Sequence, residues 1–532
     1  MKALKQSQMS NSPTEKSSWQ KLTKLASELQ TKRTVDLFDE SRVQNFTIEN
    51  ERLVFDYSKQ KVTSDVRNTL IDLLKESDFE SKRDAMFNGD AINHTEGRAV
   101  LHTALRRPET DSVSVKGENI IPVVHHTLMR IKEISDQLQN GTLQGATGKI
   151  IDTVISIGIG GSDLGPRMIC QALKSQYQTK IKTHFVSNID GEDIQSTIKQ
   201  CNPETSLIIV ISKSFTTQET LTNAITAREW LTNALPEKSD SSMHYLCVSA
   251  NVKAAKDFGI TEHNIYPMWD WVNGRFSLWS AVGISISLSF GFDVFRALLD
   301  GAYEADQNFF NNDFDQNIAI LLALLGIWNV NFLGHNSHAL LPYTEKLKYM
   351  PAYIQQLEME SNGKTINNQG DAITDYNTCP VIFGEVGTNG QHSFYQLLHQ
   401  GTQKVPCDFI GILKDDSELA HHHKLLLSHM LAQGQAMLQG RQNPDQPYRY
   451  FDGDIPSTTM LFHEMSAKSL GYLIALYEHK TFTQGVIWNV NSFDQFGVEL
   501  GKELAKKLES EDVSDADPST KSLFSKISSF NG

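Results

Sequence analysis

Two stretches of the sequence pair a short apolar run with a small polar loop of the kind that binds anions. In the first, Thr153–Arg167, the apolar run 154–157 favours a buried strand, and four glycines follow within eight residues. Glycine lets the backbone approach a ligand closely, and the unpaired N–H groups at the start of the next helix point toward it. The loop around Gly161 and Ser162 is therefore predicted to cradle a phosphate group.

The second stretch places hydroxyl groups and one ammonium at the end of another strand. The continuous apolar run Leu207–Ile211 favours a fully buried strand, and it leads directly into a Ser- and Thr-rich loop over 212–220. Ligands of open parallel sheets bind at the carboxyl ends of the strands. Hydroxyl and backbone N–H groups can saturate a phosphate while a lysine supplies charge. The residues predicted to do so are Ser212, Lys213, Ser214, Thr216 and Thr217.

Other interpretations of these loops stay open on spacing alone. Gly158-x-Gly160 is half of a dinucleotide-binding fingerprint, but Asp163 stands where the third glycine belongs, and Asp190 follows later than the expected distance of about 20 residues. A glycine turn can also be purely structural, and a Ser/Thr-rich loop is often only a solvated turn. Because both loops close an apolar strand, a phosphate site is favoured over these alternatives, including a nicotinamide-dependent oxidoreductase.

Motifs along most of the chain resemble those of the glucose-6-phosphate isomerase (phosphoglucose isomerase) family and occur in the family's order. Besides the two loops and the segment 95–102, they are Gly274–Ser280, Met359–Lys364, Thr388–His392 and Phe493–Lys502. The resemblance implies two sugar-isomerase-type domains and the interconversion of glucose 6-phosphate and fructose 6-phosphate, in glycolysis and gluconeogenesis. It also implies that no metal and no cofactor takes part.

Such an aldose–ketose isomerisation opens the sugar ring and moves a proton between C2 and C1 through an enediol. It needs a base, a cation beside the developing oxyanion and an acid–base group at the ring oxygen. The resemblance assigns the base to Glu360, the cation to Arg275, and ring opening to His392 with Lys502. It further implies that two glutamines hydrogen-bond the substrate, Gln356 and Gln495. A noncatalytic sugar-phosphate sensor would share the loops but not the four catalytic residues.

Each of these residues also has an ordinary interpretation. Glu360 is predicted to lie in a small polar loop, where a glutamate is usually solvated, and an isolated Arg275 would more often close a turn with a salt bridge. Lys502 and the glutamines would commonly be surface residues. His392 is predicted to begin a helix over 393–399, whose N-terminus would favour a neutral imidazole. In relatives this histidine reaches the active site from the partner subunit, which implies a homodimer.

No metal site is predicted. His421, His422 and His423 are consecutive, so on a helix they point in three directions and cannot converge on one ion. His422 and His429 could share a helix face, yet no carboxylate is placed to join them. A solvated helix surface is the favoured interpretation of this histidine cluster.

Length, charge and cysteine content restrict the class of protein. The 532 residues exceed what one hydrophobic core serves, so at least two domains are expected. The net charge of −14 disfavours nonspecific binding to nucleic acid or anionic membranes. Five scattered cysteines without C-x-x-C spacing fit a reducing compartment. Residues 1–20 lack an apolar signal segment, and the apolar run 318–333 is too short for a bilayer, so a cytoplasmic location is expected.

The expected fold is α/β, with two domains that each hold a mainly parallel sheet flanked by helices. The predicted division is a helical N-terminal extension packing on the large domain (1–121), a smaller domain (122–290), a larger domain (291–510) and a C-terminal tail (511–532). Strands of the smaller domain are predicted at 153–157, 183–187, 207–211 and 245–249. In the larger domain a long apolar helix is predicted at 318–333, and strand-like runs at 381–383, 409–413 and 485–488.

Two further groups of residues bear on the site. Within the mostly helical 14–110, a solvated face or an interdomain contact is favoured over a substrate role for the three arginines Arg98, Arg106 and Arg107. The chain departs from the usual family pattern at Ser214 for Thr, Asn273 for Gly, Phe276 for Tyr and Leu357-Glu358 for Gly-Asp. None of these changes removes a group that the mechanism needs. Asn273 tolerates a positive φ, and Glu358 keeps a charge two residues before Glu360.

Overall fold

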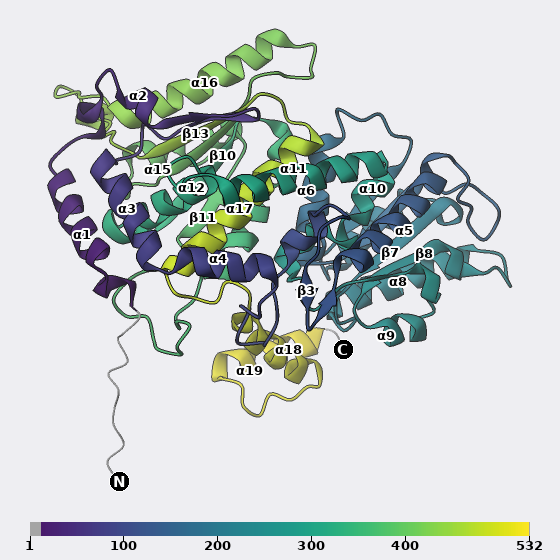
Figure 1. Cartoon of the computed structure of the whole chain (residues 1–532). Coiled ribbons are helices and arrows are strands. Elements are labelled where there is room, and N and C mark those ends of the chain that lie inside the picture. Colours follow the sequence, from purple (N-terminus) through teal and green to yellow (C-terminus); the bar gives the residue numbers. More distant parts are fainter. Residues whose placement is uncertain (1–11, 531–532) are drawn as a thin grey trace. The chain divides into compact units, whose positions relative to one another are not determined.

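The computed structural model describes residues 12–530, so residues 1–11 of the predicted N-terminal extension and 531–532 of the predicted tail lie outside the described residues. The chain forms two compact units, one running to Ser492 and one beginning at Phe493. The first unit holds a five-stranded sheet, a six-stranded sheet and a short two-stranded ribbon (Figure 1).

The five-stranded sheet is entirely parallel and has the order β6-β5-β7-β8-β9. Its strands are β5 (Thr153–Ile157), β6 (Lys182–Val186), β7 (Ser206–Ile211), β8 (Tyr245–Ser249) and β9 (Ile265–Pro267). The four strands predicted for this half are confirmed. From β5 the chain crosses to β6 on one side and then to β7 on the other. The loops after β5 and β7 therefore diverge at the carboxyl edge, which is where open sheets bind ligands.

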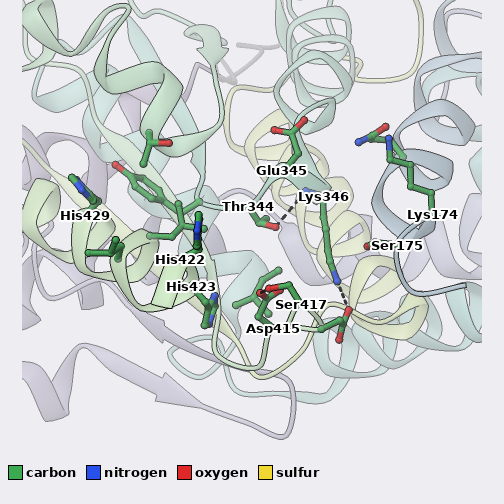
Figure 2. A pocket seen from close by; sticks show the side chains of 17 residues that line it. Lys174, Ser175, Thr344, Glu345, Lys346, Asp415, Ser417, His422, His423 and His429 are labelled. Carbon is green, nitrogen blue, oxygen red and sulfur yellow. Dashed lines mark hydrogen bonds and ion pairs between the residues drawn. The ribbon is translucent and has the colours of Figure 1, made fainter. Parts of the chain in front are cut away.

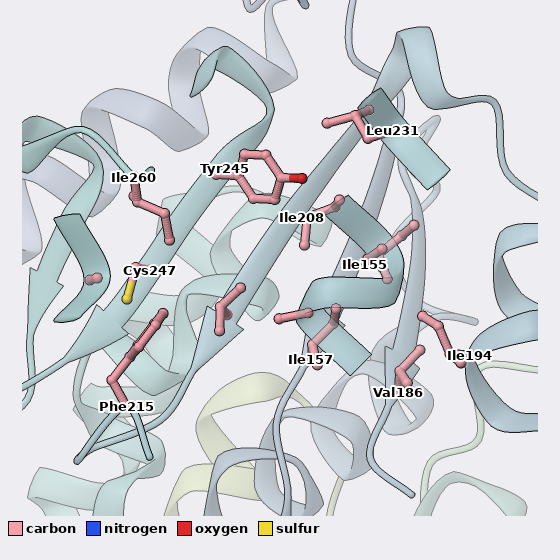
Figure 3. Close-up of a cluster of buried hydrophobic side chains, with 14 of the residues drawn as sticks. Ile155, Ile157, Val186, Ile194, Ile208, Phe215, Leu231, Tyr245, Cys247 and Ile260 are labelled. Carbon is pink, nitrogen blue, oxygen red and sulfur yellow. The ribbon is translucent and has the colours of Figure 1, made fainter. Parts of the chain in front are cut away.

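The buried strands explain why these segments lack the alternation of a half-exposed sheet. Ile155, Ile157 and Ile208 join a core with Leu231 of helix α8 (Gln218–Ala234), shown in Figure 3. Successive side chains of a strand point to opposite faces, yet every residue of β5 and β7 is buried. Both faces of the sheet are thus covered. The other helices of this region are α5 (Ile121–Gln139), α6 (Leu164–Leu173), α7 (Gly191–Ile198), α9 (Val252–Asp257) and α10 (Ile284–Phe290).

The six-stranded sheet has the order β1-β2-β13-β12-β10-β11. Four strands are parallel: β10 (Ser337–Pro342), β11 (Val381–Gly384), β12 (Cys407–Ile412) and β13 (Ser457–Phe462). The strand-like runs at 381–383 and 409–413 are confirmed. Two antiparallel strands, β1 (Thr47–Glu49) and β2 (Leu53–Asp56), extend the sheet beyond β13. This hairpin lies within 14–110, which was predicted to be mostly helical.

Long buried helices pack beside the second sheet. Helix α12 (Ile318–Ile327) continues into a π-helical turn at Trp328–Phe332, which confirms the apolar helix predicted over 318–333. The strand-like prediction for 485–488 is wrong, because residues 485–487 end the buried helix α17 (Ala467–Ile487) and Trp488 caps it. A short apolar run buried on all sides has no periodicity that separates a strand from a helix.

The remaining helices of the first unit range from 4 to 20 residues in length. They are α1 (Ser17–Leu29), α2 (Arg42–Asn45), α3 (Ser64–Glu76), α4 (Phe79–Asn88), α11 (Phe292–Asn311), α13 (Met350–Ile354), α14 (Gly387–Gln391), α15 (Tyr395–Gln400) and α16 (Ala420–Gln439). The two-stranded ribbon consists of β3 (Ser114–Val115) and β4 (Glu118–Asn119).

For Arg106, one of the two favoured interpretations, the solvated face, is wrong, whereas the other, an interdomain contact, stays a prediction. Its guanidinium is fully buried and donates hydrogen bonds to Asp306 of α11 and to Glu478 of α17. Arg98 is partly exposed and pairs with Glu96 at 3.0 Å. The buried arginine therefore joins two helices instead of facing water.

The second unit contains α18 (Glu499–Glu509) and α19 (Pro518–Phe530). A helix thus occupies much of the predicted tail, 511–532. Across residues 12–530, none of the helices combines the length and the apolar character that crossing a bilayer requires.

Candidate active site

The loop after β5 contains the residues of the predicted cradle. Gly160–Ser162 make one short 3-10 turn, in which Gly160 has a φ of +59°, and helix α6 follows at once. A Cβ added to Gly161 would lie only 2.1 Å from the carbonyl oxygen of Gly274. Only glycine permits this approach, so the cradle is pressed against the segment that carries Arg275.

Asp163 forms an ion pair beside the predicted cradle. Its carboxylate is buried and bonds the guanidinium of Arg167 at 2.9 Å. Burial raises the pKa of Asp163, although the hydrogen bond from Arg167 opposes that rise. This carboxylate is a structural partner of α6, and its charge is paired with Arg167.

The loop after β7 presents its hydroxyl groups in two pairs. Ser212 donates to Thr217 at 3.3 Å, and Ser214 and Thr216 share a hydrogen bond of 2.7 Å. Between them, Phe215 adopts a φ of +54° and buries its ring in the core. Thr217 is the N-cap of α8 without a side-chain capping bond, so the first N–H groups of this 17-residue helix face the same loop.

The side chain of Lys213 bonds to the segment that precedes Gly274. Its Nζ donates to the carbonyl oxygens of Val272 at 2.9 Å and Asp270 at 3.3 Å. Burial, with the nearby Arg98 next in importance, lowers the pKa of Lys213. The lysine therefore ties the second loop to the segment that leads into Gly274.

Arg275 lies at the centre of the candidate site. It belongs to a 3-10 helix, Gly274–Trp279, and is only 2% exposed. Its Nε donates to Ser361 Oγ at 2.7 Å and an Nη donates to the Ser492 carbonyl oxygen at 2.6 Å, while the other Nη lies 3.6 Å from Glu360 Oε1. A charged guanidinium held by neutral acceptors can face a developing oxyanion. Asn273 has an ordinary φ of −82°, so the expected need for a positive φ does not arise.

The prediction that Glu360 lies in a loop is wrong. It ends a π-helical turn, Gln355–Glu360, that continues α13, and its side chain is 24% exposed. The π turn places Gln356 beside the cradle, because a Cβ on Gly160 would lie 2.9 Å from Gln356 Nε2. Gln356 Oε1 is buried and has no hydrogen-bond partner among the described residues. An unsatisfied buried acceptor next to the cradle is suited to a ligand hydroxyl.

These contacts bring together most of the predicted residues of the first unit. Lys213 contacts the segment before Gly274, Gly161 packs on Gly274 itself, and Arg275 lies beside Glu360. The two phosphate loops and the predicted base therefore share one neighbourhood. The sequence did not indicate Ser361 or Ser492 as partners of Arg275. Ser361 lies next to Glu360 in the motif Met359–Lys364, whereas nothing in the spacing connects Ser492 with Arg275.

None of these contacts involves three further predicted residues. His392 is exposed, and it caps the C-terminal end of α14 instead of beginning a helix. The helix that follows, α15, starts only at Tyr395, so the predicted argument for a neutral imidazole does not apply. Gln495 and Lys502 belong to the second unit, where Gln495 precedes a short 3-10 helix and Lys502 lies on α18.

A cavity of about 700 Å³ opens elsewhere, at the carboxyl ends of β10 and β12 (Figure 2). It is lined by Thr344 and Lys346 after β10 and by His422, His423 and His429 of α16, but by none of the predicted site residues. Lys346 forms an ion pair with Asp416 there. Within the part of the chain that the structure describes, no three His, Cys, Asp or Glu side chains are grouped to hold a metal ion.

Comparisons with known proteins give one consistent result. The sequence model of the family described as "Phosphoglucose isomerase" matches residues 56–524. The chain is 45% identical over 518 residues to a glucose-6-phosphate isomerase of Methylococcus capsulatus, covering 94% of this chain and 95% of that protein. It is 46% identical over 515 residues to one of Pseudoalteromonas atlantica, covering 93% and 94%.

Solved structures show the same similarity at the level of the fold. The crystal structure of a glucose-6-phosphate isomerase from Chlamydia trachomatis superposes with a TM-score of 0.86 at 31% identity, covering 98% of this chain and 100% of that one. A hypothetical protein of Thermus thermophilus shares the fold with a TM-score of 0.66 at 21% identity, covering 86% and 99%.

Proposed function

The chain belongs to the phosphoglucose isomerase family, and on that premise we propose that the phosphate loops, Arg275 and Glu360 form its active site. As a member of that family it is an aldose–ketose isomerase that interconverts glucose 6-phosphate and fructose 6-phosphate. The observation that supports the site best is the 3.6 Å approach of Arg275 to Glu360, next to the glycine cradle. A base and a fixed cation there can serve a sugar whose phosphate occupies the loops.

In this proposal the phosphate is held by the donors of the two loops. The first loop contributes the backbone around Gly161 and the hydroxyl of Ser162. The second contributes Lys213 together with the hydroxyls of Ser212, Ser214, Thr216 and Thr217. Binding energy from the phosphate, which does not react, fixes the distant C1–C2 end of the sugar next to Glu360.

In the same proposal, ring opening and proton transfer are assigned to four residues. His392 and Lys502 open the ring by protonating the ring oxygen and accepting the proton of the C1 hydroxyl. Glu360 removes the proton from C2, and the electron pair moves to O1 as the enediolate forms. Arg275 stabilises that oxyanion, since it stays charged without giving up a proton. Glu360 then returns the proton to C1 while the proton of the O2 hydroxyl passes to O1, so that C2=O forms and the ketose results. Gln356 and Gln495 are hydrogen-bonding partners of the sugar in this proposal.

The remaining parts of the proposal concern organisation. We retain the division into an extension (1–121), two sugar-isomerase domains (122–290 and 291–510) and a tail (511–532). The protein would work as a homodimer in the cytoplasm, with His392 entering the partner's site. The exposure of His392 at the end of α14 supports such a role.

A coupled assay tests the function. Fructose 6-phosphate is supplied with a chelator present and no nicotinamide in the isomerising step, and formation of glucose 6-phosphate is then measured. Turnover is expected. A sugar-phosphate sensor would bind without turnover, and a nicotinamide-dependent enzyme would be silent until its cofactor was added.

Replacing Lys213 by Ala should weaken substrate binding more than it slows chemistry. A hydrogen bond to a charged group contributes about 1.5–3 kcal/mol, so KM is expected to rise about 10- to 100-fold.

Burial and Arg98 lower the pKa of Lys213, and only its ammonium form binds phosphate. KM of the unchanged enzyme should therefore rise with pH before the ordinary lysine value of 10.5 is reached, and this rise should be absent in Lys213→Arg. Lys256→Ala, at an exposed ion pair, is the matched control, and an equal KM in Lys213→Ala and Lys256→Ala would place the phosphate elsewhere.

Mixed dimers test whether His392 acts across the interface. Glu360→Gln and His392→Ala chains are coexpressed with different tags, and dimers carrying both tags are purified. If the histidine enters the partner's site, one of the two sites has both residues intact, and about half of the normal activity should return. If His392 acts within its own chain, both sites stay defective and no activity returns.

A further inference from the structure

A buried ion pair lies next to the proposed base and has no role in the mechanism above. Lys480 of α17 donates to Glu358 Oε1 at 2.6 Å, and both side chains are almost completely buried. Glu358 precedes Glu360 by two residues. The negative charge of Glu358 is therefore paired with Lys480 inside the protein and does not face Glu360 through solvent.

The turn that carries Glu360 needs such support. Residues Gln355–Glu360 form a π-helical turn, a geometry that is rare and tends to occur at functional sites. A π turn has poorer internal hydrogen bonding than an α-helix, so contacts with other elements must hold it. Because it ends at Glu360, any relaxation toward α-helical geometry would move that carboxylate.

Two consecutive residues of α17 hold this turn on both sides of Glu360. Lys480 binds Glu358, two positions before the base. The carbonyl oxygen of Thr481 accepts a hydrogen bond of 2.9 Å from the side chain of Asn362, two positions after it. Ser492 Oγ donates to the other end of that amide at 2.6 Å. The base thus lies between two anchors on one buried helix.

Other buried ionisable groups surround the ion pair of Lys480 and Glu358. Asp408 of β12 accepts a hydrogen bond of 3.0 Å from Tyr477 and lies 2.9 Å from His338 of β10. Although burial opposes its ionisation, His338 and then Lys480 help to lower the pKa of Asp408. Burial, with the Glu358 carboxylate next, raises the pKa of the neighbouring Cys379 thiol. Lys480 therefore lies between two buried carboxylates, one on the central strand β12 and one on the catalytic turn.

We propose that Lys480 is a positioning residue for the isomerisation, which fixes Glu360 through its ion pair with Glu358. This inference rests on the proposed role of Glu360. Lys480 itself does not touch the substrate. Its position on α17 ties the turn that carries the base to the buried core, while the phosphate loops are held separately by the five-stranded sheet.

The test combines two variants with a control on the same helix. Lys480→Met removes the pair and leaves Glu358 buried without its partner, so a fall in Tm is expected as well as a loss of activity. In the double variant Lys480→Met/Glu358→Met both charges are gone, and replacing a buried pair by apolar residues often restores stability. Lys468→Met makes the same substitution at the partly exposed end of α17, where Lys468 pairs with Glu304 at 3.1 Å.

The separate kinetic constants decide between positioning and plain stability. If Lys480 positions Glu360, kcat of the double variant should be about 10- to 100-fold below normal although its Tm has recovered. Inhibition by inorganic phosphate, which probes the loops, should be unchanged, and Lys468→Met should match the unmodified enzyme. A normal kcat in either Lys480 variant would overturn the proposal. If neither variant folds, Glu358→Gln, which keeps the shape and removes the charge, must show the same selective loss of kcat.

One comparison separates this inference from the proposal for the base. An active Glu360→Gln enzyme would contradict the assignment of Glu360, whatever Lys480 does. An inactive Glu360→Gln enzyme together with fully active Lys480 variants would contradict the positioning role alone.

Discussion

Glu360→Gln is expected to reduce kcat by about a thousandfold while the enzyme still binds sugar phosphate. A positioned general base contributes typically about 10²–10⁴ in rate, and glutamine retains the shape of glutamate without its basicity. The substitution leaves the phosphate loops untouched, so KM should change little. In deuterated water, exchange at C2 of glucose 6-phosphate, followed by NMR, should fall together with kcat.

An exposed glutamate outside the candidate site provides a matched control for this experiment. Glu345 is an exposed glutamate paired with Lys348 at 3.2 Å, and Glu345→Gln should leave both kcat and exchange unchanged. Retained exchange of the C2 proton in Glu360→Gln would remove Glu360 as the base. The 3.6 Å contact with Arg275 would then be only structural.

Features that depend on neighbouring residues in sequence could be predicted. The strands β5 and β7 and the loops that follow them were found because a run of apolar β-branched residues and a cluster of glycines or hydroxyls are local signals. The parallel sheet then brings both loops to one edge. The position of both loops at one sheet edge could therefore be predicted from the sequence, and their role in binding phosphate stays a prediction.

Features fixed by distant residues were missed or misplaced. The turn with Glu360 was predicted as a loop, because Ser361, Asn362 and Gly363 are poor helix formers. It is helical since Lys480 and Thr481, more than a hundred residues later, hold it. The hairpin β1–β2 likewise needs β13 as its neighbour, and a pairing between such distant segments leaves no pattern in either segment alone.

The prediction that His392 begins a helix was wrong for a related reason. The helix that ends there, α14, has only five residues and includes Gly387 and Gly390. Glycine is among the least favourable residues in a helix, so the pattern favoured the following segment. In the folded chain, α14 is stabilised by contacts with other elements. Gly387 packs directly on the ring of Tyr343, where a Cβ would lie 2.4 Å away.

Gly161→Ala should be nearly as damaging as loss of the base, although it removes no chemical group. The added Cβ would lie 2.1 Å from the Gly274 carbonyl oxygen, a backbone atom that cannot rotate away. The cradle and the Arg275 segment must then separate. A displacement of about 1 Å between binding and reacting groups can cost about a hundredfold in rate, so kcat/KM should fall by about that factor.

Gly274→Ala is the matched control for this prediction, because it changes the other partner of the same contact. A Cβ on Gly274 meets no heavy atom within 4 Å, so this variant should keep nearly normal kinetics. The same methyl group is thus added on either side of one interface, and only one side has room for it. If both variants behave alike, the close approach of the cradle to Gly274 is not what aligns the phosphate with Arg275 and Glu360. If only Gly161→Ala is impaired, the separation of these two loops controls the reaction.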